Sequence, residues 1–155
     1  MALGEQQIRR YARHILLPDI GGVGQARLLA SAALVPVGPS RPGSSVALAY
    51  LAAGGVGTLV VDDQSGAPVE PREARANILL GDEDTGEERI GALRRRIRAL
   101  NPDVSVVAAG NGAPADLAPY ALDVSEPADA GDLASALAAG GSAATRALIA
   151  LSREP

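Results

Sequence analysis

The chain has 155 residues, one histidine and no cysteine, with 18 acidic residues against 14 basic ones and a net charge of −4. The lack of cysteine excludes disulfides, thiol nucleophiles and cysteine-based zinc sites, so we expect no zinc. The negative charge and the aromatic content of 2% argue against a nucleic-acid surface, and no run of about 18 apolar residues marks a membrane span.

The N-terminal segment, 1–31, is predicted to be helical. Apolar residues recur at three- and four-residue spacings over 5–17, which predicts an amphipathic helix that Pro18 ends. A second short helix is expected over 23–31. Arginines stand where a signal peptide needs an apolar run, so we expect a cytoplasmic protein.

The segment 32–109 predicts a βαβ core. Its expected elements are, in chain order, a strand at 32–37, a helix at 43–53, a strand at 58–61 followed by two aspartates, a helical turn within 73–80, a helix at 86–100 and a strand at 103–109. This order predicts an α/β fold with a Rossmann-like, mostly parallel sheet and flanking helices. Pro36 lacks a ladder donor, which disfavours a central strand, and Ser44 is expected to cap the following helix.

The C-terminal part, 110–155, is the least well defined by its sequence, which is rich in alanine, glycine, aspartate and proline. We expect a fourth strand near Ala121 and two helices, at 129–139 and 142–152. This composition is also compatible with a loosely packed or partly disordered tail. We treat residues 1–155 as a single domain.

Three stretches of the chain carry a family pattern. They are RYARHILLP at 10–18 with GQARLL at 24–29, VALAYLAAGGVGTL at 46–59 with DD at 62–63, and RALNPDV at 98–104. In this order they resemble the ubiquitin-activating-enzyme-like adenylyltransferases, in particular the ThiF/MoeB branch, relative to which the chain is incomplete. The resemblance implies ATP-dependent adenylation, with Mg²⁺, of the C-terminal glycine of a ubiquitin-like sulfur-carrier protein.

The phosphate loop of that family, G-x-G-G-x-G-S, aligns with residues 38–44, which read GPSRPGS. Gly38 and Gly43 remain as candidate cofactor-binding residues, because glycine lets backbone N–H groups approach phosphate oxygens. Ser40 and Arg41 add side chains where the nucleotide would lie, and the two prolines of the segment lack N–H donors. The loop therefore departs from the family in its chemistry.

Acidic residues follow the second predicted strand. The resemblance implies that Asp62 binds the ribose hydroxyls of the nucleotide; the alternative is an aspartate that only starts a turn. For the neighbouring Asp63 the turn is the favoured interpretation. The family's S-N-x-x-R-Q segment places Glu73 at its asparagine and Ala76 at its arginine, so a carboxylate stands where a neutral donor to the triphosphate is expected.

Arg13 and Arg89 are the candidate catalytic residues. The resemblance implies that Arg13, from the R-Y-x-R motif, reaches the nucleotide site of a partner subunit; the alternative is a solvent-facing residue. Arg89 aligns with a phosphate-contacting lysine of the family; the alternative places it on the solvated face of the 86–100 helix. The T-D-N motif around the family's magnesium-binding aspartate does not occur, and Asp123 and Asp129 lie in that region without its pattern.

Two functional hypotheses follow. In the first, the chain is a ThiF/MoeB-like adenylyltransferase domain whose activity is weakened or lost. In the second, which the residue chemistry favours, it is a pseudoenzyme that serves as a dimerisation or regulatory partner of an active homologue. A NAD-dependent dehydrogenase ranks below both, because its fingerprint would lack the middle glycine. A homodimer, or a heterodimer with a homologue, would bury apolar residues of the N-terminal region: Ile8, Ile15, Leu16, Leu28 and Leu29.

Overall fold

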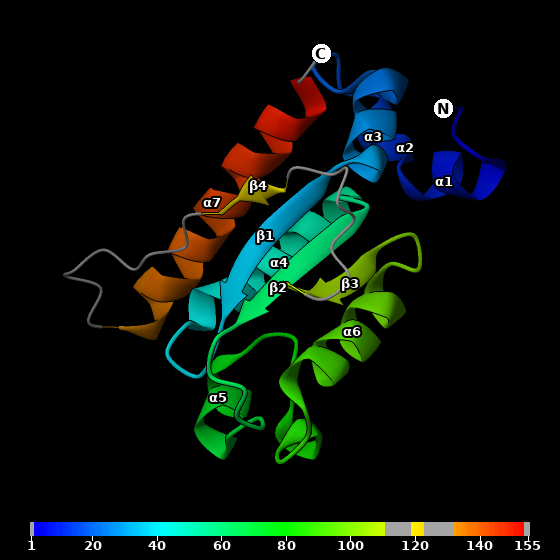
Figure 1. Cartoon of the computed structure of the whole chain (residues 1–155). Coiled ribbons are helices and arrows are strands. Elements are labelled where there is room, and N and C mark those ends of the chain that lie inside the picture. The colour runs from blue at the N-terminus through cyan, green and yellow to red at the C-terminus, as the bar shows by residue number, and fades with distance from the viewer. Residues whose placement is uncertain (1, 111–118, 123–131, 154–155) are drawn as a thin grey trace.

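The computed structural model describes residues 2–110, 119–122 and 132–153, which form one parallel sheet with helices around it (Figure 1). The strands are β1 (Ala32–Val37), β2 (Thr58–Asp63), β3 (Ser105–Ala108) and β4 (Tyr120–Ala121), in the order β3-β2-β1-β4. The helices are α1 (Glu5–Arg10), α2 (Ala12–Ile15), α3 (Gly21–Ala30), α4 (Pro42–Gly54), α5 (Pro71–Ala76), α6 (Arg89–Leu100) and α7 (Leu133–Arg153), with a 3-10 turn η1 (Asp82–Asp84). The predicted α/β class and the fourth strand near Ala121 are confirmed.

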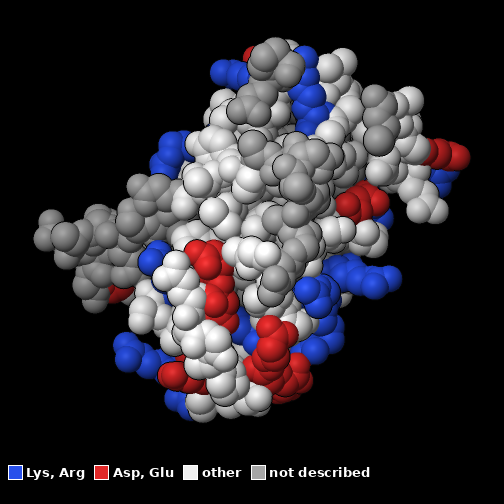
Figure 2. Space-filling model, in the orientation of Figure 1, with Lys and Arg blue, Asp and Glu red and all other residues white. Residues whose placement is uncertain are grey.

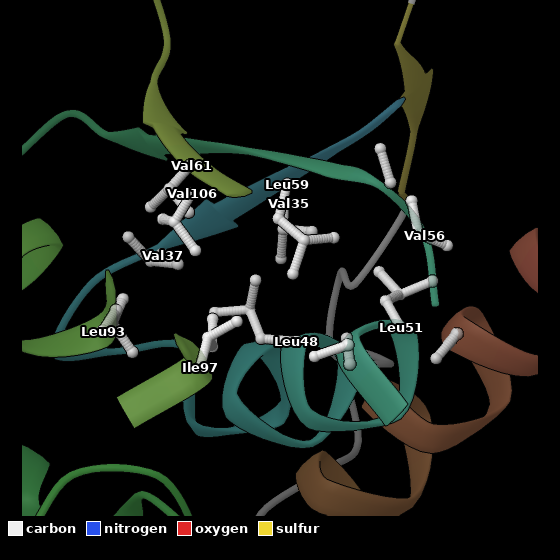
Figure 3. Packing of buried hydrophobic residues seen from close by; sticks show 14 of the residues in the cluster. Val35, Val37, Leu48, Leu51, Val56, Leu59, Val61, Leu93, Ile97 and Val106 are labelled. Carbon is white, nitrogen blue, oxygen red and sulfur yellow. The ribbon is translucent and has the colours of Figure 1, made fainter. Parts of the chain in front are cut away.

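The main core lies between the sheet and the helices α4 and α6. Figure 3 shows Val35 and Leu59 of the sheet facing Leu48 of α4 and Ile97 of α6. These side chains are fully buried, and the cluster around them consists of leucine, valine, isoleucine and alanine. Such a core is stabilised by many small apolar contacts.

The N-terminal helix predicted over 5–17 is interrupted at Tyr11. This residue ends α1 with φ −100° and ψ 16°, outside the helical region, and α2 starts after it. The break turns the Tyr11 ring inward, where it is almost fully buried. Figure 1 shows α1 to α3 near the start of β1 and α5 at the other end of the sheet, where β1 and β2 finish.

Pro36 lies in a strand with neighbours on both sides. The carbonyl of Leu34 accepts a hydrogen bond from Leu122 N, so Leu34 faces β4. Pro36, two residues further along β1, faces the same side but lies past the end of β4. The missing N–H of Pro36 therefore costs no ladder bond. Ser44 does not cap α4 as expected: its hydroxyl donates to the Pro36 carbonyl at 2.5 Å, and Arg41 takes the cap position without a side-chain bond.

A single helix, α7, replaces the two helices expected in the C-terminal part. Gly140, at its centre, permits close packing against α4: a Cβ there would lie 1.9 Å from the Gly43 carbonyl oxygen. Ala144 and Ala147 on the same side are fully buried, so this segment is packed. By length and mean hydropathy, 1.3 over 18 residues, α7 is apolar enough to cross a membrane; 28% of that stretch is buried, and the helix packs against α4.

Candidate functional site

The candidate site lies at the carboxyl end of the sheet. Because β1 and β2 are parallel, Val37 and Asp63 end at the same edge, beside the 38–41 loop, α5 and the start of α6. A cavity of about 10 Å³ remains between these segments, lined among others by Gly38, Arg41, Ser45, Glu73, Asn77 and Arg89. This volume is about that of one water-sized probe, so the space is filled by side chains of the chain itself.

Arg89 is fully buried at the start of α6, and its guanidinium is surrounded by acceptors. Nε and Nη2 donate to the two carboxylate oxygens of Glu73 at 2.7 and 2.8 Å. Nη1 donates to Asp63 Oδ2 at 2.6 Å, Ser65 Oγ at 2.9 Å and the Ala67 carbonyl at 3.0 Å, and Nη2 makes a longer contact of 3.4 Å to the Pro68 carbonyl. A guanidinium has five N–H donors, so Arg89 has none left for a ligand.

The two carboxylates around Arg89 outnumber its single positive charge. Burial alone would raise the pKa of Asp63, but hydrogen bonds from Ser65 and Arg89 outweigh it and hold that pKa below its usual value. Hydrogen bonding to Glu73, together with Asp63, raises the pKa of Arg89 despite its burial. The cluster of Asp63, Glu73 and Arg89 therefore carries a net negative charge, which disfavours a polyphosphate.

The surface around this region carries acidic and basic side chains. Figure 2 shows acidic side chains over the lower centre of the molecule, where Figure 1 places the end of β2 and α5, and basic side chains mostly toward the margins. The exposed side chains in the segments next to the buried cluster carry both signs: Glu70, Glu87 and Glu88 are acidic, and Arg41, Arg72 and Arg75 are basic.

The other predicted nucleotide-binding residues, Asp62, Gly38 and Gly43, also lie at this edge of the sheet. Asp62 is half-buried at the end of β2, and its Oδ2 accepts from Gln64 Nε2 at 3.2 Å. Gly38 has a φ of 152° and open space where a side chain would stand. A Cβ on Gly43 would lie 2.3 Å from the Ala136 carbonyl oxygen of α7, so packing of α7 already requires glycine there.

Comparison with known proteins agrees with this topology. The model of the ThiF family matches residues 11–130. The chain belongs to the ThiF family. It is 41% identical over 106 residues to the SAMP-activating enzyme E1 of Haloferax volcanii and 37% identical over 106 residues to the sulfur carrier protein ThiS adenylyltransferase of Escherichia coli K12.

These ThiF-family relatives are longer than the chain. Each match covers 68% of the chain but only 38% of the Haloferax enzyme and 41% of the E. coli enzyme. Among solved structures, PaaA superposes with a TM-score of 0.61 at 30% identity, covering 74% of this chain and 39% of that one. The E. coli tRNA N6-threonylcarbamoyladenosine dehydratase TcdA, solved with ATP, superposes with a TM-score of 0.60 at 19% identity and supports the fold alone.

The ThiF-type R-Y-x-R motif lies far from the cluster around Arg89. Arg13 is exposed on α2, which Figure 1 shows near the opposite end of the sheet from α5. This position is compatible with action on another subunit and argues against action on the site of its own chain. The role of Arg13 therefore stays a prediction.

The apolar residues expected at a ThiF-type interface divide into two groups. Leu28 is buried in the chain's own core, and Ile15 and Leu29 are half-buried. In contrast, Ile8 is 48% exposed and Leu16 is 81% exposed. A largely apolar groove of about 780 Å³ opens beside them and is lined among others by Leu3, Ile8, Ile15, Val23 and Ala26.

The structure corrects one interpretation of a single charge and extends another: the solvated-face alternative for Arg89 was wrong, and the turn expected at Asp63 is present together with an ion pair. Arg89 does not lie on the solvated face of α6: it is buried, whereas Arg94 and Arg95 are exposed. Asp63 does more than start a turn, since it bonds Ser65 and also pairs with Arg89. The signal that could have found this pair was a new glutamate at the ThiF-type asparagine position together with a positive charge kept at the ThiF-type lysine position, because such groups can form an ion pair.

Proposed function

We propose that this chain is a ThiF-family domain that has lost ATP-dependent adenylation and acts as a non-catalytic partner of an active homologue. The observation that carries the proposal is the saturation of Arg89. The resemblance implies that the residue at this position contacts a phosphate. In this chain the N–H groups of Arg89 instead donate to Glu73, Asp63, a hydroxyl and backbone carbonyls. A triphosphate would have to displace two buried carboxylates to reach it, which is costly because each would lose its ion pair.

The residues around the cluster do not fit the magnesium ion that adenylation needs. Mg²⁺ takes carboxylates with free oxygens, together with substrate phosphates. Both oxygens of Glu73 and one of Asp63 are engaged by Arg89. Within residues 2–110, 119–122 and 132–153 no group of three metal-binding side chains comes together, and Asp123 and Asp129 lie outside the described residues.

The partner we propose is a second copy of the chain or a related ThiF-type subunit. Support comes from the exposed apolar side chains of the N-terminal region, with Leu16 81% and Val23 68% exposed next to the apolar groove. Exposed apolar patches of this kind mark interaction surfaces. Through such a partner the domain would take part in activating a ubiquitin-like sulfur-carrier protein without itself binding ATP.

A second candidate function is the active adenylyltransferase. It is favoured by Asp62, to which the resemblance assigns ribose binding and whose carboxylate is half-buried and free of any ion pair within the described residues. Arg13, exposed on α2, would then act in a partner subunit. In this case ATP and Mg²⁺ would be the substrate and cofactor.

Calorimetric titration of the full chain with ATP in the presence of magnesium separates the two functions. We expect no binding, or a Kd weaker than roughly 10 μM, about −7 kcal/mol. The E. coli ThiS adenylyltransferase, titrated under the same conditions, serves as the positive control. Tighter binding would overturn the non-catalytic proposal; Asp62→Ala should then weaken it by about 1–3 kcal/mol, the worth of a hydrogen bond or two.

A further inference from the structure

The segment that carries Glu73 is held between two fixed points. On one side, Val69 is tied to the start of α6 by two backbone hydrogen bonds of 2.9 Å, from Val69 N to the Glu87 carbonyl and from Gly86 N to the Val69 carbonyl. On the other side, buried Asp84 of η1 accepts from Arg95 and Arg96 of α6 at 2.6 Å each. Residues 70–78, with α5 in them, span the distance between these anchors.

Residues 70–78 are held against the rest of the domain by Ala74, which is buried in the hydrophobic core, and by polar contacts. Ile78 N donates to Ser45 Oγ of α4 at 3.2 Å. Glu73 is 4% exposed and binds Arg89 through both of its oxygens. The six-residue α5 is far too short to be stable as an isolated helix, so its position depends on these contacts.

We infer that residues 70–78 form a lid over the carboxyl end of the sheet and that the contact between Glu73 and Arg89 is the latch that keeps the lid shut. In the closed state Glu73 occupies Nε and Nη2, the edge of the guanidinium that binds carboxylate or phosphate in a bidentate manner. Arg89 stays in place when the lid opens, since Asp63, Ser65 and Ala67 hold its Nη1. The inference concerns the closed state of the chain and does not require that ATP bind.

The absence of cysteine from the sequence makes a single introduced thiol a clean reporter of lid opening. Ala74 lies in α5 and is 5% exposed, so the thiol of Ala74→Cys is protected while the lid is shut. Glu73→Gln removes the negative charge that binds Arg89 and keeps the size of the side chain nearly constant. Glu70→Gln is the matched control, because Glu70 is an exposed glutamate at the start of the same helix with no side-chain cap bond.

The rate of thiol labelling by a maleimide should rise at least tenfold in the Glu73→Gln, Ala74→Cys chain and stay unchanged in the Glu70→Gln, Ala74→Cys chain. A thiol at Ala143, buried in α7, should stay protected in both backgrounds. Equal labelling of Ala74→Cys with and without Glu73 would overturn the latch. Equal acceleration at Ala143→Cys would overturn the lid as a local motion. Neither outcome bears on the ATP titration of the unaltered chain, which tests the proposed function.

Discussion

Asn101 donates a hydrogen bond from Nδ2 to the hydroxyl of Tyr11 at 2.8 Å, across 90 positions of the sequence. The same Nδ2 donates to the Ala52 carbonyl at 2.7 Å, and Gln25 Nε2 donates to the neighbouring Gly54 carbonyl at 3.0 Å. The three stretches that resemble the ThiF family thus meet in one buried network, which His14 extends through Nδ1 to Gln25 Oε1 at 3.0 Å. Much of the family pattern therefore specifies architecture, and it persists here although Arg89 is engaged by two carboxylates.

Tyr11→Phe should lower the free energy of unfolding by about 1–3 kcal/mol, because it leaves one buried Asn101 N–H without its acceptor. Denaturant unfolding followed by circular dichroism measures the change. Tyr50→Phe is the control, since Tyr50 is 54% exposed and a surface change of this kind stays within about 0.5 kcal/mol. Equal stability of the two variants would contradict a structural role for the Tyr11 hydroxyl.

The same tyrosine predicts a loss of stability in alkali. Burial raises the pKa of the Tyr11 phenol above its ordinary value of 10.0, outweighing the lowering by the Asn101 hydrogen bond. Above pH 10 the unfolded chain loses this proton while the folded chain keeps it, so the contribution is complete below pH 10 and is lost as pH rises through the folded pKa. Unfolding free energies measured from pH 8 upward should show this fall, and Tyr11→Phe should lack it.

Local patterning was sufficient to predict the strands β1 to β3, the helices α4 and α6, and the acidic pair at the end of β2. It failed where a long-range contact decides the structure. The two glycines at the middle of α7 predict a helix break. The helix continues through them, and the backbone of Gly43 packs closely against Gly140. Likewise, Glu73 considered alone indicates a lost phosphate ligand, and Arg89 considered alone indicates a surface charge. Only the 2.7 Å contact between Arg89 Nε and Glu73 Oε1 shows that the two form an ion pair.

Adjacent glycines of α7 should respond oppositely to substitution by alanine. At Gly140 the new Cβ would lie 1.9 Å from a backbone oxygen of α4, which cannot move without separating the helices, so Gly140→Ala should cost about 1–3 kcal/mol or more. At Gly141 the nearest atom would be Val46 Cγ1 at 3.6 Å, an ordinary contact. Gly141→Ala should therefore gain up to about 1 kcal/mol from helix propensity. Thermal unfolding compares the pair, and a shift of the same sign in both would contradict the close packing.

Restoring the phosphate loop should not restore ATP binding by itself. Replacing Pro39 and Pro42 with alanine, and Ser40 and Arg41 with glycine, returns the N–H groups and removes two side chains. The donors of Arg89 nevertheless remain bound to Glu73 and Asp63. We expect calorimetry on the repaired chain to show ATP binding no tighter than about 1 mM. A gain of tenfold or more over the unaltered chain would locate the defect in the loop and not in the ion cluster.

Association through the N-terminal region should depend on its exposed apolar side chains. Removing the whole region would be a poor test, because Tyr11 and Leu28 belong to the chain's own core. Leu16→Glu and Val23→Glu instead place charges on an exposed surface, where they should leave the fold intact and dissociate a dimer. Ile149→Glu is the matched control, since Ile149 is a 48% exposed apolar residue on α7.

Sedimentation at micromolar concentration should find a dimer for the unaltered chain and the control, and a monomer for the two N-terminal variants. A monomer in every case would exclude a homodimer and, with it, action of Arg13 on a second copy; co-sedimentation with a ThiF-type subunit would then decide whether this surface binds a homologue.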